Sequence, residues 1–306
     1  MLAQNWRLIL DGAHPASYNM ACDEAIFLSV ASGASVPVLR LYQWEPAAIS
    51  IGYHGDARQV DREHCREMGW EFVRRPTGGG AVFHDRELTY AVAAPVRGLG
   101  SDVLSVYRQV SAGLVAALRR LGLEAQLQPP HRREEARVPE AGERGSSGES
   151  QWAGVCFDTP SAYELMVGGR KVVGSAQVRR GGYFLQHGAI LIEADPHRHL
   201  WGFHIPDPDV RRQAELAFAS HAAGLADILR RPLPVGELVA AVAAGMAEAL
   251  DLTLVPSAIT DEEAKRVDWL LAHKYLTKAW NDQGVYAEGA PAASTRIVPG
   301  DAARVS

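Results

Sequence analysis

The chain has 306 residues, 47% of them hydrophobic and 22% charged, which is enough for one large core or for one core and a small appendage. Its formal net charge of -5 excludes the concentrated basic field that nucleic-acid-binding proteins use. No run approaches the roughly 18 to 20 apolar residues of a membrane span, and the opening segment MLAQNWRLILDGAHP lacks the pattern of a signal peptide. We therefore expect a cytoplasmic protein that uses neither nucleic acid nor membrane as a partner.

The first elements are predicted from the spacing of apolar residues. Met20, Ala21, Ile26 and Phe27 suit one face of an N-terminal helix. The short runs PVLRLYQW and AAISIGY that follow predict two strands. Apolar residues then recur every three or four positions over 103–121 and stop at Gly122, which predicts an amphipathic helix packed on a sheet.

The second half of the chain begins with a polar segment, residues 129–150, that has almost no large apolar side chains. We interpret this segment as a mobile surface loop, and a boundary between two domains is the alternative. The runs YELMV, RKVVGSAQV and YFLQHGAILIE come next, and the pairs Gly168-Gly169 and Gly181-Gly182 separate them, so they predict an antiparallel meander. From about residue 209 the pattern is helical, and residues 283–306 are predicted to be a disordered tail.

A glycine-rich segment, RRPTGGGAVFHD at residues 74–85, is the first candidate site. Successive glycines allow the backbone to approach a ligand and to point its N–H groups at a carbonyl or phosphate oxygen. The segment matches neither the phosphate-binding loop nor the dinucleotide pattern, so it does not by itself indicate a nucleotide. A glycine-rich hairpin corner is the alternative interpretation.

Cysteine usage gives the second candidate. The chain has three cysteines far apart in sequence, without the close pairs of zinc sites, so we expect neither a disulfide framework nor a structural metal. Cys22 suits the apolar face of the first helix and Cys65 lies in the charged segment DREHCREMGW, and we interpret both as structural. Cys156, in CFDTPS, stands between the polar loop and a strand, where it can be a nucleophile or a small buried hydrophobic residue.

The third candidate is the segment RKVVGSAQ at residues 170–177. If Gly168-Gly169 form a two-residue turn, Lys171 lies across from Met166 near the turn end of the meander. A lone lysine on a strand is usually a solvated edge residue. Lys171 and Cys156 are fifteen positions apart, 171 − 156, a separation that neither requires nor forbids contact.

Taken together and in this order, these segments resemble the lipoate–biotin protein ligase superfamily, and within it the octanoyltransferases. The resemblance runs from about Trp6 to about Asn281, and Gln186-His187-Gly188 and Lys274-Tyr275…Trp280-Asn281 are further anchors. It implies an α+β fold, with a mixed, largely antiparallel sheet flanked by helices. It also implies a catalytic domain at residues 1–250 and a C-terminal helical extension at 251–282.

The resemblance implies a role for each matching position. Cys156 would be the acyl-thioester nucleophile, and Lys171 would lower the pKa of its thiol. The substrate would be bound by the two glycine-containing segments and the QHG anchor, through Arg75, Thr77, Gly78, Gly79, Gly80, Ala81, His84, Gly174, Ser175, Ala176, Gln177, His187 and Gly188. Backbone N–H groups of Gly78–Ala81 and Gly174–Gln177 would flank the acyl carbonyl, and the acyl chain would lie in a tunnel under the glycine-rich loop.

The implied reaction moves an octanoyl group from octanoyl-acyl carrier protein to a lysine of a lipoyl domain, first that of the glycine-cleavage H protein. A thioester donor already holds the free energy for amide formation, so no cofactor is expected. We expect a monomer. The basic pairs Arg132-Arg133 and Arg179-Arg180 are candidate contacts for an acidic carrier protein, although such pairs are usually only solvated.

Three rival functions remain open. Gly80 gives the GGGAVFHD form common among ATP-dependent lipoate–protein ligases, whereas the octanoyltransferases tend to carry arginine there. Those ligases have no need of a cysteine at position 156, so Cys156 favours the transferase. An octanoyl amidotransferase acting between lipoyl domains uses a cysteine in a different sequence context. A non-catalytic module that binds acyl carriers or lipoyl domains is the third rival.

Overall fold

The computed structural model describes residues 4–100, 102–128 and 164–286. Cys156, the predicted loop at 129–150, the Arg132-Arg133 pair and residues 287–306 of the predicted tail lie outside the described residues.

Two sheets form the frame of the described chain. In the larger sheet β1 is parallel to both of its neighbours, β11 and β2, and every other neighbouring pair is antiparallel. The larger sheet has the order β11 (Leu252–Ser257), β1 (Gln4–His14), β2 (Val38–Trp44), β6 (Glu87–Pro95), β10 (Tyr183–Leu191), β9 (Arg170–Arg180), β8 (Leu165–Val167), β7 (Ala125–Leu127). The smaller sheet has the order β4 (Glu71–Arg74), β3 (Ala48–Ile51), β5 (Val82–His84).

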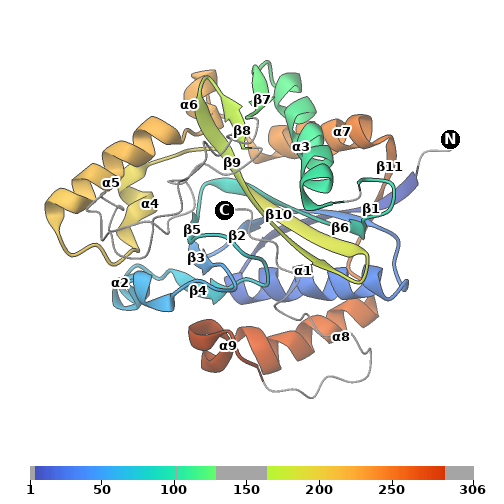
Figure 1. Cartoon of the computed structure of the whole chain (residues 1–306), viewed down its shortest axis with the longest axis horizontal. Helices are drawn as coiled ribbons and strands as arrows, with labels where there is room; N and C mark the ends of the chain where they lie inside the picture. The colour runs from blue at the N-terminus through green and yellow to red at the C-terminus, as the bar shows by residue number, and fades with distance from the viewer. Residues whose placement is uncertain (1–3, 101, 129–163, 287–306) are drawn as a thin grey trace, which may run out of the picture.

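Helices cover both faces of the larger sheet (Figure 1). On one face α3 (Val103–Arg120) packs against α7 (Val235–Leu250), and on the other α1 (Ala16–Ala31) lies between the sheet and α8 (Asp261–Leu270). The remaining helices are η1 (Ala57–Gln59), α2 (Arg62–Glu67), α4 (Pro196–Trp201), α5 (Pro208–His221), α6 (Leu225–Leu229), the π-helical turn η2 (Leu271–Tyr275) and α9 (Lys278–Gln283). The α+β fold with a mixed, largely antiparallel sheet is confirmed.

The alternation of side chains along β2 shows how the sequence forms two cores. Leu39 and Leu41 face the α3–α7 side, whereas Val38 and Tyr42 face α1. Both faces are therefore apolar, as expected for a sheet with helices on either side.

The predicted meander is confirmed by the order β8, β9, β10 and by its register. Met166 lies across from Lys171, and both glycine pairs adopt positive φ values, between 54° and 83°. Glycine tolerates this conformation without a steric penalty, so the two hairpin turns follow directly from the sequence.

The helical prediction for residues 251–282 is wrong at its start, because β11 (Leu252–Ser257) joins the edge of the larger sheet beside β1. Its side chains are mostly exposed and it contains Pro256, which an edge strand tolerates because one side of its backbone has no strand partner. The division into a catalytic domain at 1–250 and an extension at 251–282 stays a prediction.

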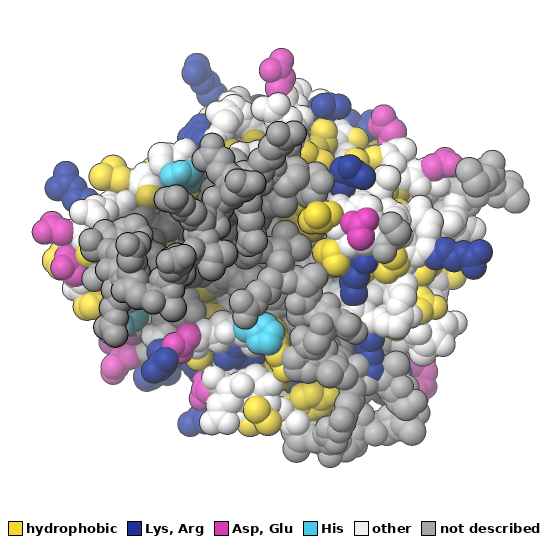
Figure 2. All heavy atoms as spheres, in the orientation of Figure 1, with side chains coloured by type: hydrophobic (Ala, Val, Ile, Leu, Met, Phe, Trp, Pro, Cys, Tyr) yellow, Lys and Arg dark blue, Asp and Glu magenta, His cyan; other side chains and the backbone are white. Residues whose placement is uncertain are grey.

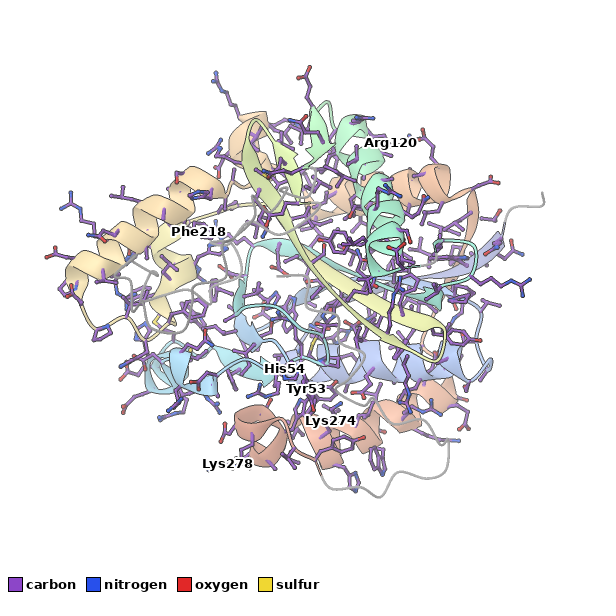
Figure 3. All side chains as sticks on the ribbon, viewed as in Figure 1. Tyr53, His54, Arg120, Phe218, Lys274 and Lys278 are labelled. Carbon is purple, nitrogen blue, oxygen red and sulfur yellow. The ribbon has the colours of Figure 1, made fainter. Side chains whose placement is uncertain are left out.

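A buried lysine attaches the C-terminal helices to α1. Lys274 Nζ lies 2.7 Å from Glu24 Oε2 and 3.9 Å from the ring centroid of Trp280. Tyr275 also donates its hydroxyl proton to the Glu24 carboxylate. Burial lowers the pKa of Lys274, and the Glu24 carboxylate acts in the opposite direction. Figure 3 shows Lys274 close to Tyr53, whose ring contacts the same Trp280 ring with centroids 5.6 Å apart and planes tilted by 55°.

No helix in the described part of the chain is both long enough and apolar enough to cross a membrane.

The buried pair predicts an asymmetric effect on stability. Lys274→Met should lower the free energy of unfolding by about 3–5 kcal/mol, because the Glu24 carboxylate stays buried without its cation. The double variant Glu24→Gln/Lys274→Met should lose less than the sum of the two single losses. Urea unfolding measures all three values, with Lys265→Met, in the exposed pair with Glu262, as the control expected to change little. Additive losses at Glu24 and Lys274 would contradict the coupling.

Candidate active site

A pocket opens between the two sheets, where β3 and β5 of the smaller sheet face β9 and β10 of the larger one. It spans about 380 Å³ when the part open to solvent is included, its cavity volume is about 30 Å³, and most of its surface is apolar. The lining comes from both sheets, α1 and the segment after β4, and consists of Met20, Tyr42, Trp44, Ser50, Arg75, Val82, His84, Thr89, Gly174, Ser175, Ala176, His187, Gly188 and Ala189.

Arg75 organises the glycine-rich loop at one side of this pocket. The residue is 4% exposed, and its guanidinium donates to the carbonyl oxygens of Gly78 and Gly80, each at 2.7 Å from Nη2. Nη1 donates to Ser50 Oγ at 3.1 Å. A planar guanidinium presents several donors in a fixed geometry, so a single side chain determines the path of the loop and links it to β3.

Gly52 lies behind the same loop. A Cβ atom at this position would lie 2.1 Å from the carbonyl oxygen of Gly79, so no other residue fits without moving the loop. Tyr53 N donates to the Thr77 carbonyl at 2.8 Å and continues the contact. Gly52 was not among the predicted site residues, although a glycine directly after a strand is a signal of such a close approach.

His187 joins the loop to α1. Its Nε2 lies 2.7 Å from Thr77 Oγ1 and its Nδ1 lies 2.9 Å from Asp23 Oδ2. Asp23 also accepts hydrogen bonds from Tyr42 and Arg40. An ionised carboxylate only accepts, so Asp23 assigns the proton of neutral His187 to Nδ1, and Nε2 accepts the Thr77 hydroxyl proton.

The charges of this group follow from burial and partners. Burial lowers the pKa of His187, and Arg75 and His84 act in the same direction, against the opposing effect of Asp23. Burial alone raises the pKa of Asp23, but the hydrogen bond from His187 and the Arg40 cation hold it below its ordinary value. The site therefore keeps an anion at Asp23 and favours a neutral His187.

A second histidine, His84, forms a similar chain of hydrogen bonds on the other side of Arg75. His84 Nε2 lies 2.7 Å from Ser50 Oγ, and His84 Nδ1 lies 2.9 Å from Glu87 Oε1. Its ring stacks on Trp44 with centroids 3.9 Å apart and 13° between the planes. Thr89 donates to the same Glu87 oxygen. Ser50, His84 and Glu87 are all buried, and the first two line the pocket.

The opposite wall is formed by β9 and β10. Ser175 Oγ lies 2.7 Å from Tyr90 Oη, and a Cβ at Gly188 would approach the Tyr90 ring to 2.8 Å. Gly188 therefore makes room for Tyr90 beneath the strands. Gln177 is directed elsewhere, since its amide donates to Gln186 Oε1 at 2.9 Å.

The expected substrate-binding residues divide into two groups. The structure brings seven of them together as pocket lining: Arg75, His84, Gly174, Ser175, Ala176, His187 and Gly188. The other six are not part of the lining, although the loop residues among them adjoin it: Thr77, Gly78, Gly79, Gly80, Ala81 and Gln177.

Lys171 is buried, with 5% of its surface exposed, and its Nζ lies 2.6 Å from Glu164 Oε1. It does not line the pocket, but it lies on the strand whose residues Gly174–Ala176 do. The description of a lone lysine on a strand edge as solvated does not apply to it. Its expected partner, Cys156, lies outside the described residues.

The other two cysteines, Cys22 and Cys65, are buried. Burial raises the pKa of Cys22 to about 12 and that of Cys65 to about 11. A thiol is a nucleophile only as its thiolate, so neither residue is suited to attack a thioester. Among the described residues no group of His, Cys, Asp and Glu side chains could hold a metal ion.

The Arg179-Arg180 pair does not have the exposure expected of a docking site. Arg180 is buried, at 8% exposure, and Arg179 donates to Gln177 Oε1 and to the Asp102 carbonyl.

Asp23, Ser50 and Glu87 were missed in the sequence analysis. Asp23 and Glu24 stand together in the apolar run MACDEAIF, and Ser50 interrupts the run AAISIGY. A polar residue within a buried apolar run is the signal that could have identified Asp23 and Ser50, because such groups require partners inside the protein.

Comparisons with known proteins place this geometry in a family. A model of the lipoyl protein ligase A/B catalytic domain matches residues 15–247. The chain is 42% identical to the octanoyltransferase LipM of Kyrpidia tusciae, with 91% of this chain and 98% of that protein aligned. It is 41% identical to the octanoyltransferase LipM of Symbiobacterium thermophilum, with 90% and 98% aligned.

Solved structures agree. A bipartite lipoate protein ligase from Thermoplasma acidophilum has a TM-score of 0.75 at 26% identity, covering 93% of this chain and 99% of that one. A lipoate-protein ligase A bound with ATP has a TM-score of 0.71 at 26% identity, covering 91% and 99%. The chain therefore belongs to the lipoyl protein ligase A/B catalytic domain family.

Proposed function

We propose that this protein transfers an octanoyl group from octanoyl-acyl carrier protein to a lysine of a lipoyl domain, with the glycine-cleavage H protein as the first acceptor. The protein is an acyltransferase of the lipoate ligase family, and octanoyl transfer in lipoylation is the activity that its relatives support. The observation that carries the proposal is an apolar pocket lined by residues of the segments 74–85 and 170–177, in a chain 42% identical to an octanoyltransferase.

The pocket suits an acyl chain in its chemistry. Met20, Val82 and Ala189 give it apolar walls, which an alkyl chain fills favourably, since burial gains about 0.8 kcal/mol per methylene. Arg75 and Ser50 lie together at the side of the glycine-rich loop, so we expect the carbonyl end of an acyl group to face that loop. Ligand pockets commonly combine apolar walls with a few polar groups in this way.

Cys156 would receive the acyl group as a thioester and release the carrier's thiol. A target lysine would then attack, giving the amide and regenerating the cysteine in a ping-pong reaction. Cys22 and Cys65 are buried with raised pKa values, which leaves Cys156 as the candidate nucleophile. Lys171, with its ammonium held by Glu164, is the candidate that favours the Cys156 thiolate.

The acyl carbonyl would be stabilised by backbone N–H groups. Among the described strands, β8 pairs with β9 only as far as Val173, so Gly174–Gln177 have a strand neighbour on the β10 side alone. This edge faces the pocket through Gly174, Ser175 and Ala176. Donors fixed in advance near a developing oxyanion usually give the largest single contribution to catalysis.

An ATP-dependent ligase is the second candidate, because a lipoate-protein ligase A bound with ATP shares the fold at 26% identity. With purified protein, octanoyl-carrier substrate without ATP should modify an H-protein acceptor, and free lipoate with ATP should not. Acceptor mass is the measurement. Modification only from the free acid and ATP would exclude the transferase.

Replacing the proposed nucleophile tests catalysis against mere binding. Cys156→Ala should abolish transfer, because no other thiol is positioned to carry the acyl group. Cys22→Ala and Cys65→Ala are controls for loss of a thiol. A non-catalytic carrier-binding module would keep its acyl-carrier binding unchanged in all three variants and would show no transfer even in the parent protein.

Replacement of Lys171 should slow acylation by an amount that depends on pH. Lys171→Ala should slow formation of the acyl-enzyme near neutral pH, because loss of the ammonium lets the thiol pKa return toward about 8.5. Above that pH both proteins hold mainly thiolate, so the deficit should shrink. The measurement is the stopped-flow rate of acylation from about pH 6 to about pH 10, a range that spans the thiol pKa. A deficit of constant size would assign Lys171 a structural role.

A further inference from the structure

A groove separate from the active-site pocket lies beside β4, between α2 and α9. Figure 1 shows these three elements next to one another at the edge of the smaller sheet that β4 forms. The groove has a cavity volume of about 890 Å³, and its floor includes the aromatic rings of Trp70 and Phe72. None of the described residues that line it also lines the active-site pocket.

The rim of this groove is basic. It carries four cationic side chains and two carboxylates, although the whole chain has a formal net charge of -5. Both carboxylates are already paired, Asp56 with Arg58 at 2.7 Å and Asp282 with Arg62 at 3.0 Å. Arg62 is also held over the Phe72 ring, with its guanidinium carbon 3.9 Å from the ring centroid. The four cations of the rim are Arg58, Arg62, Arg66 and Lys278.

Two of these cations have no partner within the described parts of the chain. The side chains of Arg66 and Lys278 are exposed and make neither a hydrogen bond nor an ion pair there. Arg62 and Arg66, one helical turn apart in α2, line the groove. Glu63 and Glu67 repeat at the same spacing on another face of α2 and are not part of the lining. The groove therefore offers positive charge that a partner can neutralise.

We propose that this groove docks an acidic helix of the acyl carrier protein, an inference that rests on the proposed function for the identity of the partner. An apolar floor with a basic rim fits an amphipathic helix. The apolar stripe of that helix would cover Trp70 and Phe72, and its carboxylates would pair with Arg66 and Lys278. Charge complementarity of this kind speeds association and selects among partners.

The groove lies close to the glycine-rich loop. The segment after β3 joins the two, because Gly52 lies against the loop at Gly79 and Asp56, four residues on, lines the groove. β4 gives a second connection. Phe72 lines the groove, and Arg75, three residues or about 10 Å further along, lines the pocket. A carrier docked in the groove would present its flexible pantetheine arm around the end of β4, beside the glycine-rich loop.

Charge reversal at the two unpaired cations tests the docking. In the full-length protein, Arg66→Glu/Lys278→Glu should weaken binding of octanoyl-acyl carrier protein by about tenfold or more, the lower end of what electrostatic steering provides. The difference from the parent should shrink at about 1 M salt, where charges are screened beyond about 3 Å. Octanoyl transfer from octanoyl-pantetheine, which lacks the carrier's protein part, should keep the parent's rate. Fluorescence anisotropy of labelled carrier and transfer rates from both donors are the measurements.

Arg108→Glu/Arg212→Glu is the matched control. Both arginines are exposed, lie on α3 and α5 outside the groove, and have no ion pair within the described residues. The control changes the net charge by the same amount and should bind the carrier as the parent does.

Unchanged carrier affinity in Arg66→Glu/Lys278→Glu would overturn the docking, as would an equal loss in the control or an equal loss of transfer from octanoyl-pantetheine. Weaker binding of the lipoyl-domain acceptor in place of the carrier would overturn the choice of partner. A parent that binds the carrier through these two cations but transfers nothing from it would instead refute the proposed function and leave the docking intact.

Discussion

The site depends on two adjacent buried arginines at the end of β4 that bind backbone oxygen atoms. Arg75 binds the carbonyls of Gly78 and Gly80, which sets the shape of the glycine-rich loop. Arg74 binds the carbonyls of Gly52, Tyr53 and Gly55 and those of residues 280–282, which joins β3 to α9. A guanidinium is the one side chain with enough donors in fixed geometry to satisfy so many carbonyls at once.

This constraint makes the pocket a product of segments distant in sequence. α1 contributes Asp23 to the His187 side of the pocket and Glu24 to the buried Lys274, so consecutive residues of one helix support the site and the C-terminal helices. The two histidine chains flank Arg75 and differ chiefly in whether their hydroxyl reaches the pocket. Figure 2 shows basic and acidic side chains interspersed among the described residues of one face.

Much of the fold was predictable because it follows from local sequence patterns, namely apolar periodicity and glycine turns. The glycine pairs fixed the meander, and the register of Met166 opposite Lys171 followed from a two-residue turn. β1 and β11 were not predicted. They form a parallel pair, and a parallel pair has no hairpin turn whose residues could be recognised in the sequence. Within the site, His84 and His187 were predicted but their partners were not. Asp23 meets the His187 ring only through tertiary packing, which sequence spacing does not encode. Glu87 stands three residues after His84, and this local spacing went unused.

The central claim is that the acyl group rests covalently on Cys156 between donor and acceptor. Its most direct test is intact and peptide mass spectrometry of the parent protein after brief mixing with octanoyl-acyl carrier protein in the absence of acceptor. The account predicts an octanoyl adduct on the peptide that contains Cys156, removed on addition of a lipoyl domain at a rate no slower than turnover. Product formation without any such adduct would contradict it.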